Sequence, residues 1–139
     1  MATSVRRLIV AAIVAQLKTI TILNEYNTEI GNSVVDWNIG NIDQAKLPQV
    51  EVKDPSESST RKGTMDYAVL SIEIVGRIVD TLDNARNLLT DITEAMKVGP
   101  AYPANVYLST LTDKPELLPD EKDKKAVKVT MAYEVKYRE

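Results

Sequence analysis

The residues that most often carry chemistry are absent from this chain. It has 139 residues and contains neither cysteine nor histidine. Without thiols it forms no disulfides, thiolate metal sites or cysteine nucleophile. Without imidazole it lacks the usual zinc ligand, the base of a Ser-His-Asp triad and the commonest general base. Any acid–base chemistry would therefore have to use carboxylates.

The carboxylates offer one candidate arrangement. Glu73 and Arg77 lie two pleats apart on the polar face of an expected strand, and a salt bridge on a sheet surface is the simpler interpretation of this pair. The alternative is a small carboxylate-based enzyme or ligand-binding domain. It would need a pocket lined with Asp66, Glu73 or Asp36 and closed by Trp37.

Other binding motifs are weak. The acidic run at 120–123 lacks the spacing and central glycine of a calcium loop, and the five glycines form neither a dinucleotide fingerprint nor a phosphate loop. The clusters of basic residues, such as Arg61-Lys62, are no longer than dipeptides and have no interleaved aromatic residues, and the formal charge is −3. We expect no catalytic residues, no cofactor, no metal and no sequence-specific nucleic-acid binding.

Two amphipathic helices are expected. Apolar residues recur at helical spacing from Ser4 to Ile20, with Ser4 as the cap, and again from Asp80 or Thr81 to Val98, where Gly99-Pro100 ends the pattern. No run of 18 apolar residues occurs, so we expect no membrane span.

Alternating apolar and polar residues predict four strands, at 49–53, 66–79, 106–111 and 127–137, and a short fifth strand is an option at 34–39. Polar or proline-containing segments near 54–64 and 112–125 predict long mobile loops. The strand at 127–137 would span roughly 35–40 Å, about twice the typical length. Such a length indicates that something outside the subunit covers its ends.

These elements predict a single α+β domain over residues 1–139. Its sheet would be antiparallel or mixed, with four or more strands and two α-helices packed on one face, in the chain order helix-strand-strand-helix-strand-strand. The composition, 44% apolar and 27% charged, is that of an ordinary globular domain.

The pattern resembles the tail terminator, or tail completion, proteins of long-tailed bacteriophages and prophages. The resemblance covers most of the chain except Tyr26–Lys46. It rests on an apolar N-terminal helix, the strand opening Leu47-Pro48-x-Val50-x-Val52, a Ser/Glu-rich segment, the strand end Ile74-Val75-Gly76-Arg77-Ile78, the helix Ala85–Met96 and a final strand bearing tyrosines.

The resemblance implies a structural virion protein without catalysis. Members of this family form a ring, commonly a hexamer, that caps the tail tube, stops its polymerisation and offers a surface for head–tail joining. The implied partners are further copies of the chain, the tail tube protein, a neck or head-completion protein, and DNA that passes through without sequence-specific binding. The implied location is the head-proximal end of the virion tail, after assembly in the host cytoplasm. A different head–tail connector or neck protein is the alternative within this class.

Candidate contact residues follow from these expectations. Exposed or loop positions and the tyrosines of the last strand supply the candidates for partner contacts, which are Arg61, Lys62, Trp37, Leu117, Leu118, Tyr133 and Tyr137. If the second helix faces the lumen of a ring, Asp91 and Glu94 would make that lumen weakly negative, which suits a pore that must not grip DNA.

Overall fold

The computed structural model describes residues 4–37, 48–62, 65–78, 82–119 and 127–138. Two α-helices, two short 3₁₀ helices and five strands make up the described chain. In sequence order they are α1 (Val5–Leu17), η1 (Ile22–Asn24), η2 (Ile30–Ser33), β1 (Val34–Asp36), β2 (Gln49–Lys62), β3 (Met65–Ile78), α2 (Leu82–Val98), β4 (Val106–Pro119) and β5 (Val127–Arg138).

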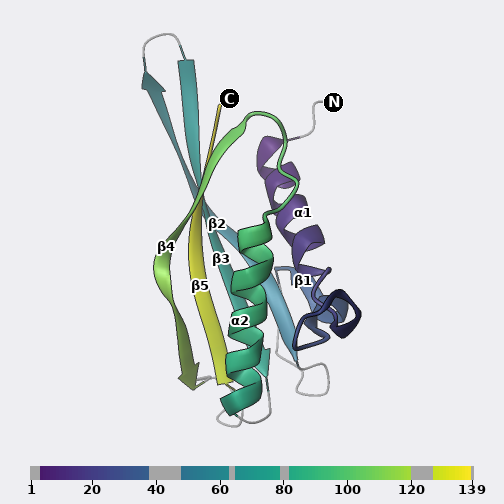
Figure 1. Ribbon diagram of the computed structural model, residues 1–139. Helices are drawn as coiled ribbons and strands as arrows, with labels where there is room; N and C mark the ends of the chain where they lie inside the picture. Colours follow the sequence, from purple (N-terminus) through teal and green to yellow (C-terminus); the bar gives the residue numbers. More distant parts are fainter. Residues whose placement is uncertain (1–3, 38–47, 63–64, 79–81, 120–126, 139) are drawn as a thin grey trace.

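The described strands form one mixed sheet in the order β1-β2-β3-β5-β4 (Figure 1). The short strand β1 runs parallel to β2, and every other neighbouring pair is antiparallel. The mixed sheet and the α+β class confirm that part of the sequence expectation. The chain order differs from it by one element, because β1 precedes β2 and gives helix-strand-strand-strand-helix-strand-strand.

Both α-helices cover the same face of the sheet (Figure 1). Helix α1 contacts β1 and β2, and α2 contacts β3 and β5. At Gly76 the sheet and α2 approach so closely that an added Cβ would lie 3.1 Å from a Leu88 methyl carbon. The amide of Gln16 donates to the carbonyl oxygen of Ala95 at 2.8 Å and so joins the two helices. The buried apolar residues of helices and sheet form one cluster.

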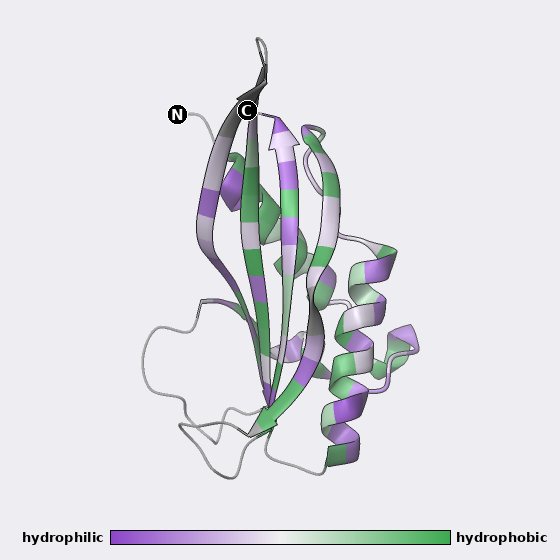
Figure 2. Ribbon diagram, turned by 90° about the vertical axis from the view of Figure 1, so that its left-hand side faces the viewer, coloured by the Kyte–Doolittle hydropathy of each residue, from purple (hydrophilic) through white to green (hydrophobic). Residues whose placement is uncertain are grey.

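The long central strands follow the predicted alternation. In β3 the residues Ala68, Leu70, Ile72 and Ile74 are buried in the core, and β5 buries every second residue from Val129 to Tyr137. Figure 2 shows the same alternation as bands of apolar and polar residues along the strands. Most of the apolar surface that the sheet buries therefore lies on the face that the helices cover, and its burial stabilises the fold there.

The helix ends use the expected chemistry. The Ser4 hydroxyl accepts from the amide of Arg7 at 3.4 Å and caps α1, which ends at Leu17 rather than Ile20. Gly99, with φ +99°, follows the end of α2 in a backbone conformation that favours glycine. The expected cap of α2 at residue 80 or 81 lies outside the described residues. No helix in the described part of the chain is long and apolar enough to cross a membrane.

The prediction of two long loops was wrong for most of their length. Residues 54–62 continue β2 and pair with β3, and residues 112–119 continue β4 and pair with β5. Prolines and the scarcity of apolar residues suggested loops, but backbone pairing does not require apolar side chains. The prolines lie where the ladders shift register, with Pro55 between Lys53 and Ser56 and Pro115 between Asp113 and Glu116. Residues 63–64 and 120–125 of these segments lie outside the described chain.

Candidate interaction surfaces

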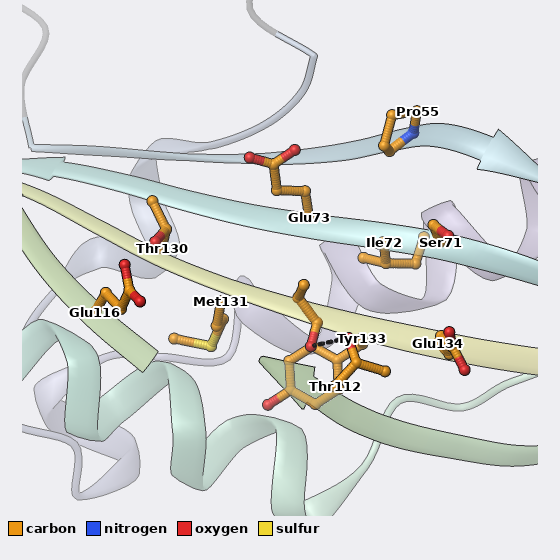
Figure 3. Close-up of a pocket in the computed structure, with 11 residues that line it drawn as sticks. Pro55, Ser71, Ile72, Glu73, Thr112, Glu116, Thr130, Met131, Tyr133 and Glu134 are labelled. Atoms are coloured by element: carbon orange, nitrogen blue, oxygen red, sulfur yellow. Dashed lines mark hydrogen bonds between the residues drawn. The ribbon is translucent and has the colours of Figure 1, made fainter. Parts of the chain in front are cut away.

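A polar groove of about 550 Å³ lies across the strands β2, β3, β5 and β4 (Figure 3). Its described lining includes three carboxylates on three different strands, Glu73, Glu116 and Glu134, and no basic residue. The Thr112 hydroxyl donates to the carbonyl oxygen of Ala132 at 3.2 Å along this lining. A surface of this charge repels phosphate groups rather than binding them.

The groove does not reproduce the pocket that the enzymatic alternative requires. Glu73 lines it, but Trp37 and Asp36 do not, and the side chain of Asp66 lies outside the described part of the chain. Among the described residues, no group of three or more acidic side chains is placed to hold a metal ion. Of the nominated residues whose side chains are described, Glu73 alone lines the groove.

Arg77 forms its ion pair with a residue on the neighbouring strand. Its guanidinium donates to Glu51 Oε1 at 2.6 Å, and the ammonium of Lys53 lies 3.5 Å from the same oxygen. Glu51 and Arg77 are both buried. The sequence suggested Glu73 as the partner, but Glu51 lies diagonally opposite Arg77 in the β2–β3 ladder, within reach of a long side chain.

Trp37 lies at a corner where α1, β1 and β2 meet. Its indole N–H donates to Asp54 Oδ1 at 2.6 Å, and Arg6 Nε donates to the other carboxylate oxygen at 2.5 Å. The Lys53 ammonium lies 5.9 Å from the indole ring centroid. The backbone of Trp37 has φ +50°, a conformation rare for an aromatic residue, and the side chain is exposed. The single tryptophan of the chain thus has its side chain at the surface, where a partner can reach it. An interface anchor requires this exposure.

The charge on Asp54 contributes to stability in a pH-dependent way. Burial acts to raise the pKa of Asp54, but the hydrogen bonds from Trp37 and Arg6 and the charge of Arg6 outweigh it, so the pKa lies below its ordinary value of 3.8. A depressed carboxyl pKa stabilises the fold above the unfolded-state pKa, and this stabilisation is lost as the pH falls through the folded-state pKa.

We expect Asp54→Asn to lower the free energy of unfolding by about 1–2 kcal/mol at pH 7, because Arg6 loses the nearer of its two carboxylate partners, Asp54 and Glu57. The difference between the variant and the wild type should shrink as the pH falls below 3.8, where the wild-type carboxylate also becomes protonated. Urea denaturation between pH 7 and pH 2.5 measures both free energies. A difference that stays constant across this range would contradict the assignment.

The other nominated contact residues divide between surface and core. Leu118 is exposed, and Leu117 is half-buried against the core. Arg61 and Lys62 lie near the end of β2, but their side chains are outside the described part of the chain. Tyr133 and Tyr137 face the core and are buried, so neither ring is available for a partner in this structure. The same alternation that identified their strand places them on its inward face.

The two candidate lumen residues also differ. Glu94 is exposed and lies 3.5 Å from the ammonium of Lys97. Asp91 is only 2% exposed and accepts hydrogen bonds from the backbone and side-chain amides of Asn27 and from the Thr28 hydroxyl. The expectation that Asp91 is a solvent-facing helix position was wrong. It lies between Leu88 and Ala95 on the buried stripe of α2 and anchors the segment after η1.

One surface was missed by the reasoning from sequence. The six consecutive residues 107–112 of β4 are all exposed, and they include Tyr107, Leu108 and Leu111. Tyr107 contacts Tyr67 of β3 edge to face, with ring centroids 5.9 Å apart. The uncharged run Tyr-Leu-Ser-Thr-Leu-Thr was visible in the sequence, but its position at the edge of the sheet follows only from the topology.

The comparisons with known proteins bear on the fold. No protein-family model and no curated protein matches the chain. Among solved structures, the chain is similar to a chain of a structure described as "Virion of native gene transfer agent (GTA) particle", with a TM-score of 0.74. The alignment has 13% sequence identity and covers 99% of this chain and 100% of the other. The two chains share a fold from end to end.

Proposed function

We propose that this chain is a structural protein of a phage-like virion that forms a ring on the head-proximal end of the tail tube. The observation that carries the proposal is the shared fold, which spans nearly all of this chain and all of a chain from a gene transfer agent virion. The resemblance of the sequence to tail terminator proteins supports the same class independently of the fold comparison. In this role the ring, a hexamer as in the tail terminator family, stops tube growth and presents a surface for head–tail joining.

The exposed surfaces of the chain are compatible with its assembly into such a ring. The partners in this proposal are further copies of the chain, the tail tube protein and a neck protein, and DNA passes through the ring. The acidic groove and the exposed Glu94 would not bind phosphates, which is what a passage for DNA needs. Trp37 and Leu118 are the nominated contact residues that the structure shows at the surface. Binding through them would add apolar area to the interface.

Deletion of the coding gene from its phage or prophage tests the proposal. We expect electron micrographs to show tails that are longer than normal and are not joined to heads, because tube polymerisation is no longer stopped. Wild-type protein supplied from a plasmid should restore both tail length and joining. Tails of normal length without heads would instead favour the alternative, a head–tail connector or neck protein. Normal infectious particles would contradict a role in the virion.

A further inference from the structure

An apolar groove of about 560 Å³, here called the α1 groove, runs along the solvent-facing side of α1. One wall is a face of the helix that carries Leu8, Ala11, Ala12 and Ala15, and the other is formed by Ala101 and Pro103 between α2 and β4 (Figure 1). The two remaining lining side chains already have partners. The Gln16 amide donates to the Ala95 carbonyl at 2.8 Å, and the Thr19 hydroxyl donates to the Gln16 carbonyl at 2.6 Å. No charged residue is part of the described lining, so the groove favours an apolar ligand surface.

The length and chemistry of the α1 groove favour an α-helix as its occupant. From Leu8 to Thr19 it follows about three helical turns, or roughly 16 Å. The described walls present side chains rather than a strand edge, so an occupant must satisfy its own backbone hydrogen bonds. A helix does so, and the small alanine side chains of the wall let its ridge of side chains approach closely. A flat bilayer surface would leave the hollow unfilled.

One flank of the α1 groove is basic. Arg7, Ala11 and Lys18 are spaced i, i+4 and i+11, which places both cations on the same side of the helix face that lines the groove. Both cations are exposed, and neither forms an ion pair with a described residue. Residues 5–18 include no acidic residue, and residues 98–105 on the opposite wall include no charge. An acidic side chain on the occupant would therefore be attracted along α1 and would meet no like charge.

Two exposed apolar side chains lie at the Thr19 end of the α1 groove. Ile22 is 61% and Leu23 is 92% exposed. The short helix that carries them is fixed to the end of α1, because the Asn24 side-chain amide donates to the Thr19 carbonyl at 2.9 Å. The Ile22 backbone amide also donates to Glu29 Oε1 at 2.7 Å. These apolar side chains are thus held in place to contact a helix that extends past Thr19.

We propose that the α1 groove binds an amphipathic helix of a different protein, with apolar residues along one face and acidic residues along the flank that meets the two cations. The α-helices of a second copy do not fit this description. Helix α1 has no acidic residue, and Asp91 of α2 is buried. The exposed Asp83 and Glu94 of α2 already form ion pairs within their own helix. The proposal goes beyond tail capping, because the groove can bind such a helix whether or not the chain ends a tail.

Peptide titration followed by NMR tests the proposal. The probe is a side-chain-bridged helical peptide of about four turns, with alanine and leucine on one face and glutamate along one flank. A matched peptide carries lysine in place of every glutamate. At low salt we expect the glutamate peptide to bind at least about ten-fold more tightly, with amide shifts confined to residues 7–24 and 98–105. The net charge of −3 opposes this preference, so it would have to come from the basic flank. Equal binding, no binding of either peptide, or shifts elsewhere on the molecule would overturn the proposal.

Substitutions separate the apolar wall from the basic flank. Ala15→Glu places a carboxylate in the groove and should abolish binding of the glutamate peptide. Arg7→Glu combined with Lys18→Glu should reverse the preference in favour of the lysine peptide. Arg86→Glu, a charge reversal at an exposed position of α2, should leave the preference unchanged. Thermal unfolding checks that every variant folds. If the double variant binds the glutamate peptide as tightly as the wild type does, the basic flank does not recognise the partner and the proposal is wrong.

Two further measurements address other occupants of the α1 groove. We expect the sedimentation behaviour of the chain alone to be the same for Ala15→Glu and the wild type. If the substitution abolishes self-association, a second copy fills the groove and the proposal fails. We also expect vesicles of anionic phospholipid to leave the groove amides unshifted, and shifts there without peptide binding would identify a lipid surface instead. Tail length in the gene deletion tests tail capping separately, so either proposal can fail while the other stands.

Discussion

Replacing Asp91 with alanine is expected to lower the free energy of unfolding by about 3 kcal/mol. The carboxylate is buried and accepts three hydrogen bonds, at 3.0 and 3.1 Å from Asn27 and at 2.7 Å from Thr28. Alanine removes the charged acceptor of three hydrogen bonds from a position on α2 that is only 2% exposed. Hydrogen bonds to charged groups contribute about 1.5–3 kcal/mol to stability, so we expect a large loss although Asn27 is exposed to water. Chemical denaturation at neutral pH measures the loss.

Two further variants separate the hydrogen bonds from the position on the helix. Asp91→Asn keeps one carbonyl acceptor and should lose less than the alanine variant. Glu94→Ala, three residues further along α2 and exposed, should change stability by less than about 0.5 kcal/mol. If Asp91→Ala were as stable as Glu94→Ala, the carboxylate would not anchor the 27–28 segment.

Gly31→Ala is expected to destabilise the fold by a similar amount, about 3 kcal/mol. An added Cβ would lie 2.4 Å from the carbonyl oxygen of Lys18 and 2.7 Å from that of Ile20. These are backbone atoms and cannot rotate away as a side chain can. The Gly31 amide also donates to the Ile20 carbonyl at 2.8 Å, so relieving the clash would lengthen that bond. Thermal and urea unfolding of the variant measure the combined cost.

Gly99→Ala is the matched control for this clash. Gly99 has φ +99° but no atom within 4 Å of an added Cβ, so its substitution carries backbone strain without steric overlap. We expect a loss of about 1–2 kcal/mol there. Equal losses at the two glycines would show that close packing at Gly31 does not matter.

Asp91 and Gly31 hold the connection between the first helix and β1 at two points. Gly31 fixes it to the end of α1, and Asp91 fixes it to α2. The connection leads directly into β1, which pairs with β2 and is followed by Trp37. We therefore expect both substitutions to disturb the Trp37 corner as well, which tryptophan fluorescence would report.

The elements with strong periodicity could be read from the sequence. The alternation in β3 and β5, the helical stripes and the stop at Gly99 each express burial on a single face, and burial is a property that a local pattern records. The sequence also places Asp91 between Leu88 and Ala95 on the buried stripe of the helix, but the charge of an acidic residue predicts a solvent-facing position. Only the tertiary structure supplies the donors at Asn27 and Thr28 that make its burial favourable.

The sequence alone determined the class of the fold, the two helices and the inward face of the long strands, because these depend on where apolar residues recur along the chain. It also determined what chemistry is missing, since no arrangement can supply a thiol or an imidazole that the chain lacks. The tertiary structure decided the full length of β2 and β4, the pairing of Arg77 with Glu51, and the order of the strands in the sheet. Each of these features depends on which strand, distant in the sequence, pairs with the strand in question. Backbone hydrogen bonds and cross-strand contacts are nearly independent of local composition, so a polar segment containing proline can still form the edge of a sheet.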